Sequence, residues 1–333
     1  MKKHNIVPEK KIKLSIIMPA YNVERYVRDS LISVCKQLPD YAELIIINDG
    51  STDNTEQRIL ETIASYQWKN ISYILQDNRG IAFTRNEGVE RARGEYITFI
   101  DSDDFWSDDY IDVMSKPLQE GYDIIEYGVN RFIIDKDEIV TTVKIHHLNL
   151  PGDNKLERIF RLSRWFTFSR VYKKELWNNI KFPTGRRYED IATIPVIYMK
   201  ANSIKTLENA LVYYRDNPAS IVNNVNDSDI NDIIHAINYV REYFAKHHSE
   251  NMHLCSLTLI RTAVSLKITH QKLNRRSKNN EFKKIIRAVV SDINYKKITP
   301  SDFKRLVYLL LPQSFCNLIL SFNNKFISIK KIN

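Results

Sequence analysis

Two carboxylates stand close together at Asp101 and Asp103, directly after the apolar residues 96–100. Carboxylate oxygens are ligands that Mg²⁺ and Mn²⁺ prefer, and two of them with open positions around the ion suit a metal shared with substrate phosphates. An exposed polar turn would contain the same two residues. The pair alone therefore leaves both interpretations open.

A third carboxylate, Asp49, follows another apolar run, residues 44–47. A carboxylate fixed at such a place can accept a hydrogen bond from the imide N–H of a nucleobase. Capping of the next helix is the competing explanation, but it accounts for Ser51 and Asp53 and leaves Asp49 unassigned. Tyr21, after the first apolar run, can stack on a base or be an ordinary surface tyrosine.

Arg85 lies five residues after Gly80, inside an expected helix. From there it can reach back and balance the charge of Asp101 and Asp103, although a lone arginine on a helix is usually solvated. The two acids Glu189 and Asp190 begin another expected helix, where the helix dipole alone favours acidic residues.

The elements that would position these residues alternate as in a parallel sheet with crossover helices. We expect strands at residues 12–18, 44–47, 71–75 and 96–100, with helices at 23–37, 53–66 and 81–92. In open α/β sheets the ligand lies beyond the carboxyl ends of the strands. The polar clusters that follow the four strands are therefore expected to meet in one crevice.

The rest of the chain shifts from strand to helix patterns. We expect strand-rich hairpins over 122–147 with a turn at 135–137, helices at 153–177 and 189–201, and two short strands near Ile204 and Leu211. Further helices are expected at 229–247, 251–269, 281–292 and 301–320. These patterns predict one domain at residues 1–225 and a helical domain at residues 226–333.

Charge is unevenly distributed along the 333 residues. The chain has 49 basic and 40 acidic residues, a net charge of +9, but residues 261–333 hold 16 basic and 3 acidic residues. This tail therefore carries +13 and the first 260 residues carry −4. Such a body is not a general nucleic-acid binder, and the tail is expected to be a separate interaction surface.

Composition also limits the class of protein. The cysteines Cys35, Cys255 and Cys316 have no paired spacing, which argues against a disulfide framework or structural zinc and favours a reducing compartment. We expect no secretory signal at residues 1–13 and no membrane span at residues 306–324, a stretch that is short and interrupted by polar residues and Pro312.

In the tail, aromatic and aliphatic residues alternate with Lys and Arg at residues 303–308 and 325–331. One interpretation is an amphipathic region on the anionic inner leaflet of the cell membrane, where lipid-linked acceptors are found. The other is a helical domain that packs on the body or self-associates into a homo-oligomer. No nucleic-acid-binding module accompanies the charge.

Four of these segments, in this order and spacing over about 90 residues, resemble the family 2 glycosyltransferases of the GT-A fold. They read SIIMPAYN at 15–22, INDGSTD at 47–53, N-x-G-x4-R-N-x-G at 78–88 and DSDD at 101–104. The resemblance continues through FPTGRRYED at 182–190 and YYRDNPASI at 213–221. It covers roughly residues 12–222 and does not reach the last hundred or so.

The resemblance implies a fold and a set of site residues. The fold is α/β: the Rossmann-like mixed sheet of nucleotide-diphosphosugar transferases, here with a C-terminal helical region. The uracil-contacting acidic residue maps to Asp49, the metal ligands to Asp103 and Asp101, and the catalytic base to Asp190. The expected donor-binding residues are Pro19, Ala20, Tyr21, Asp49, Asn78, Arg85, Asp101, Ser102 and Arg215.

Two residues depart from the pattern of the family. Asn48 stands where many members carry Asp, and Arg170 stands where relatives often have Lys. Neither change removes a proposed reactive group, but the second leaves the role of Arg170 open.

The activity implied is that of an inverting hexosyl- or N-acetylhexosaminyltransferase that uses Mn²⁺ or Mg²⁺. It would move a sugar from UDP to a hydroxyl of a glycan or lipid-linked acceptor, in synthesis of capsule, lipopolysaccharide core or teichoic acid. Its place would be the cytoplasm, at the inner face of the membrane. The alternative is a non-catalytic glycan- or nucleotide-binding scaffold that keeps the fold, although such a scaffold would be expected to have lost Asp103 or Asp190.

Two other classes of enzyme fit poorly. A dinucleotide-binding dehydrogenase needs Gly-x-Gly-x-x-Gly after the first strand, where residues 19–22 read PAYN. An enzyme that forms sugar nucleotides would need a glycine-rich basic phosphate loop, and the whole chain has 8 glycines.

Overall fold

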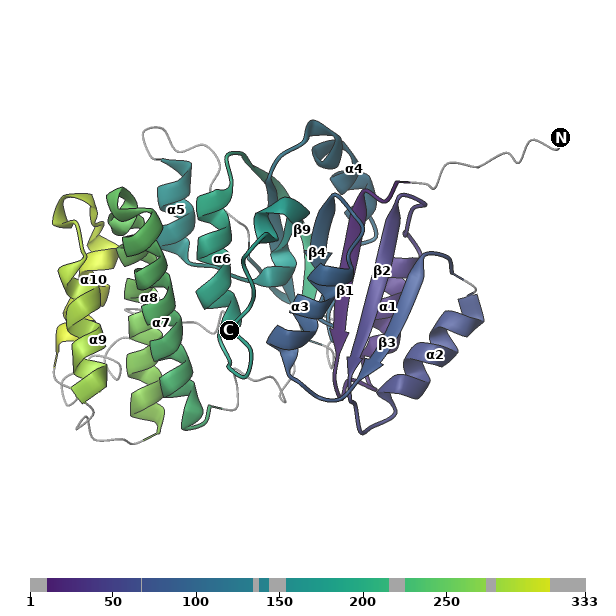
Figure 1. Ribbon diagram of the computed structural model, residues 1–333, viewed down its shortest axis with the longest axis horizontal. Coiled ribbons are helices and arrows are strands. Elements are labelled where there is room, and N and C mark those ends of the chain that lie inside the picture. The colour runs from purple at the N-terminus through teal and green to yellow at the C-terminus, as the bar shows by residue number, and fades with distance from the viewer. Residues whose placement is uncertain are drawn as a thin grey trace. The chain divides into compact units, whose positions relative to one another are not determined.

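The computed structural model describes residues 11–66, 68–133, 138–143, 154–215, 225–273 and 280–311 (Figure 1). The chain forms two compact units. The first unit consists of Met1–Leu148, Phe166–Gly185 and Lys200–Asn217, and the second of Asn149–Trp165, Arg186–Met199 and Pro218–Asn333.

The first unit is built on a mixed sheet in which the described residues form nine strands. Their order is β3-β2-β1-β4-β8-β6-β9-β5, and β7 pairs with β6. The strands are β1 (Leu14–Ala20), β2 (Ala42–Asp49), β3 (Ile71–Gln76), β4 (Tyr96–Phe99), β5 (Phe105–Trp106), β6 (Ile124–Ile133), β7 (Glu138–Val143), β8 (Arg170–Lys173) and β9 (Ile204–Arg215).

The first four strands run parallel to one another, so their carboxyl ends lie at one edge of the sheet. The other half is mixed, because β8 runs antiparallel to β4 and β6 while β9 runs parallel to β6. The sheet edge at which we expected a crevice is therefore formed by β1 to β4.

Helices cover both faces of the parallel half. They are α1 (Val27–Cys35), α2 (Thr55–Tyr66), α3 (Ile81–Arg91) and α4 (Tyr110–Glu120). Ile16 and Met18 of β1 belong to a core shared with Leu31 of α1. Ile17 points to the opposite face, where it meets Gly88 of α3. Burial on both faces explains why all residues of β1 except Ser15 are apolar.

Gly88 sets the approach of α3 to the sheet. A Cβ atom at this position would lie 2.3 Å from Cγ2 of Ile17. Only a residue without a side chain allows the helix to lie this close to β1. The glycine therefore sets the distance between α3 and the sheet, and with it the positions of the other side chains of α3.

The second unit is helical in the residues described. It contains α5 (Lys155–Leu162), most of α6 (Glu189–Lys200), α7 (Ser228–His247), α8 (Met252–Lys272), α9 (Asn280–Ser291) and α10 (Pro300–Leu310). Phe160 of α5 meets Phe244 of α7 edge-to-face at 5.8 Å, and the Trp165 indole donates to the Thr258 hydroxyl at 2.8 Å. None of the helices in the described ranges has both the length and the apolarity to cross a bilayer.

Most of the expected elements are present. The seven elements expected before residue 100 and the helices expected at 189–201, 229–247, 251–269 and 281–292 are confirmed within a few residues at each end. The strand β5 and the helix α4 were not expected. The turn at 135–137 and residues 312–320 of the last expected helix lie outside the described residues.

Two expectations in the middle of the chain are wrong. The helix expected over 153–177 ends at Leu162 and is followed by β8, flanked by 3₁₀ turns at Thr167–Ser169 and Lys174–Trp177. Val171 and Tyr172 are fully buried between β4 and β6, so pairing in the sheet overrides the helical pattern. The two short strands near Ile204 and Leu211 are one strand, β9, with shifts of register against β6.

The division at residues 225 and 226 stays a prediction. The second compact unit includes that C-terminal region and adds the segments that carry α5 and most of α6.

Candidate active site

Asp49 ends β2 and is almost completely buried, at 3% exposure. Its Oδ1 accepts hydrogen bonds from the Gln76 amide at 2.6 Å and from the Arg79 backbone N–H at 2.9 Å. Its Oδ2 accepts one from the Gly80 N–H at 2.8 Å. Asp49 therefore fixes the turn between β3 and α3.

Gly50 lets that turn approach the end of β2. Its φ is +68°, a conformation that residues with a side chain rarely adopt, and a Cβ atom would lie 2.7 Å from the Asn78 backbone nitrogen. Asn78 is exposed beside it. The Asp-Gly pair thus brings an expected donor-binding residue close to the end of β2.

The turns after β1 and β2 are tied to each other. Asn22, in the left-handed region with φ of 51°, donates its N–H to the Ser51 hydroxyl and accepts from the Thr52 N–H at 2.8 Å. Asn48 accepts from the Ser51 N–H at 3.0 Å and donates to the Tyr73 hydroxyl. The amide of Asn48 thus supplies a donor that the more usual Asp would lack.

Around these turns, the residues expected near the base differ in exposure. Pro19 and Ala20 are buried at the end of β1, whereas Tyr21 is 48% exposed. Asp53 accepts from the Thr55 N–H at 3.0 Å, so the helix-capping interpretation is correct for Asp53.

Arg85 reaches from α3 to the acidic loop after β4. One of its terminal nitrogens lies 2.8 Å from Oδ1 of Asp101, and both side chains are largely shielded from solvent. The proximity suggested by the sequence spacing is therefore present. A buried arginine at this place supplies positive charge next to Asp101, in the loop that also carries Asp103.

The loop after β4 is also held from β9. The backbone N–H of Arg215 donates to Oδ1 of Asp104 at 2.9 Å, and its Nε donates to the Asp103 carbonyl at 2.8 Å. Asp104 is fully buried, and this burial, together with the Asp103 and Asp101 carboxylates, raises its pKa well above the usual value. Ser102 is buried in the same loop.

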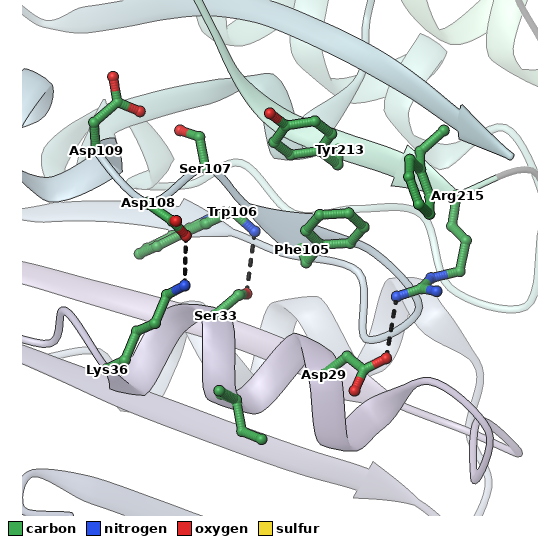
Figure 2. A pocket seen from close by; sticks show the side chains of 12 residues that line it. Asp29, Ser33, Lys36, Phe105, Trp106, Ser107, Asp108, Asp109, Tyr213 and Arg215 are labelled. Carbon is green, nitrogen blue, oxygen red and sulfur yellow. Dashed lines mark hydrogen bonds and ion pairs between the residues drawn. The ribbon is translucent and has the colours of Figure 1, made fainter. Parts of the chain in front are cut away.

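Arg215 lines a cavity of about 740 Å³ formed by residues of α1, β5, the following loop, β6 and β9 (Figure 2). Its guanidinium lies 5.1 Å from the centres of the Tyr26 and Phe105 rings and 3.7 Å from the Asp29 carboxylate. Phe105 stacks on Tyr213. These contacts fix the arginine, which in turn supports the backbone of Asp103.

Asp190 belongs to the second compact unit, unlike every other expected site residue. It lies in the first turn of α6, and its Oδ1 accepts from the Ile191 N–H at 2.7 Å. The residue two before it, Tyr188, has a φ of +63°, which is strained for an aromatic residue. Burial and the Asp229 carboxylate raise the pKa of the Tyr188 hydroxyl to about 12.

The segment before Asp190 is anchored to α7. The Arg187 guanidinium lies 3.2 Å from Asp229, and its backbone N–H donates to Asp232. Arg186 pairs with Asp232 at 3.2 Å. Because Asp229 is completely buried, these contacts hold the strained turn that starts α6.

Comparison with known proteins gives the family. The model of "Glycosyl transferase family 2" matches residues 15–194, which is more than half of the chain. The chain belongs to glycosyl transferase family 2. The matched segment includes each expected site residue except Arg215.

Three bacterial proteins illustrate the curated relatives of this family 2 chain. It is 28% identical to glycosyltransferase GlyA of Streptococcus pneumoniae over 63% of its own length and 31% of GlyA, so it spans less than a third of that relative. It is 29% identical to glycosyltransferase GlyG of the same organism, over 63% of the chain and 72% of GlyG. A third relative, 38% identical over 32% of the chain and 42% of its own length, is the putative teichuronic acid biosynthesis glycosyltransferase TuaG of Bacillus subtilis.

Solved structures of S. aureus TarS have the same fold. One covers 89% of the family 2 chain and 83% of its own length at a TM-score of 0.65 and 20% identity. A second, in complex with UDP-GlcNAc, gives a TM-score of 0.66 at 19% identity, over 89% of this chain and 84% of its own. The predicted GT-A class, a mixed sheet followed by C-terminal helices, is confirmed.

The acidic pair of this family 2 chain fits a divalent cation that takes further ligands from a substrate. Asp101 and Asp103 are half-buried carboxylates in the loop that follows β4. Within the described ranges, no three His, Cys, Asp or Glu side chains are grouped so that they could hold a metal. Two hard oxygen ligands suit Mg²⁺ or Mn²⁺ when a diphosphate and water complete the coordination.

Three residues of the site were missed in the sequence. Gln76 pairs with Asp49 in the β2–β3 register, and its place as the first polar residue after an apolar run was an available signal. Asp104 stood in the motif without a role. No local sequence pattern pointed to a role for Asp229, because its partner Arg187 lies about forty residues earlier in the chain.

Arg170, to which the sequence assigned no role, has a structural one. Its side chain is buried at 1% exposure and donates to the Phe166 carbonyl and the Ser169 hydroxyl. It therefore stabilises the turn that leads into β8.

Proposed function

We propose that the protein is an inverting glycosyltransferase that moves a hexosyl or N-acetylhexosaminyl group from a UDP-sugar to a hydroxyl of a glycan or lipid-linked acceptor. The observation that supports this best is the convergence of contacts at one sheet edge. Arg85 neutralises Asp101 while Asp49 fixes the neighbouring turn. Both contacts lie in the segment that matches the family model.

The nucleoside would lie beside Tyr21, whose half-exposed ring offers a stacking surface next to the Pro19 backbone. Asp49 would accept the uracil imide N–H through Oδ2, the oxygen that already accepts from the Gly80 N–H. A carboxylate oxygen has lone pairs for two such bonds. The preference for UDP rests on the family resemblance and on the UDP-GlcNAc that TarS binds.

The leaving diphosphate would be bound by positive groups of this chain. Asp103 and Asp101 would hold the Mn²⁺ or Mg²⁺ ion that neutralises diphosphate charge when bound. Arg85 adds fixed positive charge at the same edge, and Arg215 holds the Asp103 backbone in place. Charges arranged before the reaction stabilise the developing negative charge without reorganisation.

Asp190 would act as the base. Its carboxylate would take the proton of the acceptor hydroxyl as the acceptor oxygen bonds to the anomeric carbon and the bond to UDP breaks. This single displacement inverts the anomeric configuration. General-base assistance is worth about 10²–10⁴-fold in rate.

The biological setting would be synthesis of a cell-surface polysaccharide, at the cytoplasmic face of the membrane. The relative TuaG, a putative teichuronic acid biosynthesis glycosyltransferase, supports this setting. The acceptor would then be a growing glycan or a lipid-linked sugar, and the protein would bind the membrane only peripherally.

Turnover of UDP-sugars by Asp190→Asn tests the proposal. We expect unchanged UDP affinity and a rate at least about 100-fold lower, whereas Glu250→Gln, an exposed carboxylate in the same unit, should leave both unchanged. If Asp190→Asn turned over substrate at the wild-type rate, Asp190 would not be the general base. UDP binding that is absent, or indifferent to Mn²⁺, would favour the non-catalytic scaffold.

A further inference from the structure

Exposed apolar side chains gather on one part of the second unit. Among the described residues, eight large apolar side chains are exposed, and four of them lie between residues 295 and 310. Tyr295 is 62% exposed, Phe303 57%, Val307 39% and Leu310 63%. The last three belong to α10 at spacings of four and three, so they share one face of the helix.

The chain holds this face outward. At the N-terminus of α10, Thr299 and Asp302 form a capping box, and Asp302 also pairs with Arg161 and Arg305. At the C-terminus, the buried ammonium group of Lys267 donates to the carbonyls of Tyr308, Leu309 and Leu311. With both ends fixed, the helix cannot rotate to bury the apolar face.

Most of the charged side chains in this stretch are basic. Lys296, Lys297 and Lys304 are exposed, as are three basic residues of α9, Lys283, Lys284 and Arg287. The acidic residues between positions 283 and 311 are Asp292 and Asp302, and both are engaged by arginines. The exposed part of this stretch therefore offers cations and apolar groups.

We infer that Tyr295, Phe303, Val307 and Leu310, together with Lys296, Lys297 and Lys304, form a membrane-docking surface for anionic lipid. Aromatic and aliphatic groups enter the boundary between headgroups and acyl chains, while lysines meet the negative lipids. This inference rests on the proposed membrane location of the protein.

A second copy of the chain fits the surface less well. The 11 residues of α10 extend over about 16 Å. That length presents far less than the roughly 800 Å² per partner that a stable interface needs. A two-fold contact would also bring identical lysines together, and like charges repel.

Sedimentation of the full-length protein with vesicles tests the inference. The wild type should bind vesicles of phosphatidylglycerol and phosphatidylcholine at least about 10-fold more tightly than vesicles of phosphatidylcholine alone, and high salt should weaken this binding. Phe303→Gln with Leu310→Gln should reduce it at least about 10-fold.

The matched control is Leu60→Gln with Tyr66→Gln, which removes one aliphatic and one aromatic side chain of similar exposure from α2. It should bind vesicles like the wild type. Circular dichroism melting of both variants checks that they fold. The assay contains no donor, so a failure of docking and a failure of the proposed transfer reaction are separate results.

Three outcomes would overturn the inference. The first is a wild type that does not bind anionic vesicles. The second is the Phe303 and Leu310 variant binding them as the wild type does, which would place binding elsewhere in the basic tail. The third is a lipid-free dimer in sedimentation velocity that this variant abolishes, which would assign the surface to a second copy.

Discussion

The guanidinium of Arg85 lies 2.8 Å from Oδ1 of Asp101, with 7% of the arginine side chain exposed. The arginine comes from α3 and the carboxylate from the loop after β4, so the contact joins a crossover helix to the acidic motif. Gly88, one turn further along α3, lets the helix lie against β1 and so sets the reach of Arg85. The packing of α3 on β1 therefore determines whether Arg85 can reach Asp101.

Replacement of Arg85 should lower the stability of the fold. Arg85→Gln leaves Asp101 without its partner in a largely buried place, and we expect a loss of about 3 kcal/mol in the free energy of unfolding, measured in urea. Arg91→Gln, which removes an exposed ion pair on the same helix, should change it by less than about 0.5 kcal/mol. Equal effects of the two changes would contradict the structural role of Arg85.

Asp49→Asn tests the turn that precedes α3. The amide has one oxygen, so its NH₂ group must face at least one of the N–H donors of Gln76, Arg79 and Gly80. An unmet donor at this depth should cost about 1–3 kcal/mol in unfolding free energy, and UDP affinity should fall with it. The exposed neighbour Asp77→Asn is the control, and a wild-type unfolding midpoint in Asp49→Asn would count against this account.

Gly88→Ala should force α3 away from β1. The added methyl group collides with Ile17, and overpacking of this kind costs about 1–3 kcal/mol. A double-mutant cycle with Ile17→Ala separates this collision from other effects, because the smaller residue makes room for the methyl group. We expect the double variant to be more stable than the sum of the single changes predicts, by about 1 kcal/mol or more. Strict additivity would show that the contact does not limit the packing.

Asp229→Asn should act on the start of α6. It weakens the hold on Arg187 and so on the strained Tyr188 that precedes Glu189 and Asp190. A misplaced catalytic group can cost about 10²-fold in rate, so we expect kcat to fall at least 10-fold. The Kd of UDP, measured by calorimetry, should stay unchanged. A weaker UDP Kd with an unchanged kcat would argue against a positioning role.

The sequence predicts the parallel half of the sheet well because local signals agree there. The apolar runs that become β1 and β2 end at polar clusters, and the helices α1 and α2 have regularly spaced buried residues. The same signals fail at β8. Its residues 170–173 are short and adjoin a helical pattern, and only pairing with β4 and β6 makes them a strand.

The candidate site also contains residues that the sequence predicts and residues that it does not. The strand-end residues Asp49, Asp101 and Asp103 are visible in the sequence because they lie within three residues of the end of an apolar run. Their partners are not, since the bonds of Arg215 to Asp103 and Asp104 join residues more than a hundred positions apart. Such contacts depend on the order of strands in the sheet, which local patterns do not encode.

The alternation of the two units along the chain has a consequence for synthesis on the ribosome. Phe160 and Trp165 are made early, but their partners Phe244 and Thr258 emerge about eighty to ninety residues later. At roughly 5–20 residues per second this delay is about 4–19 s. During that interval α5 cannot pack against α7 and α8, because these helices have not been synthesised. The second unit can therefore fold only after its C-terminal helices emerge.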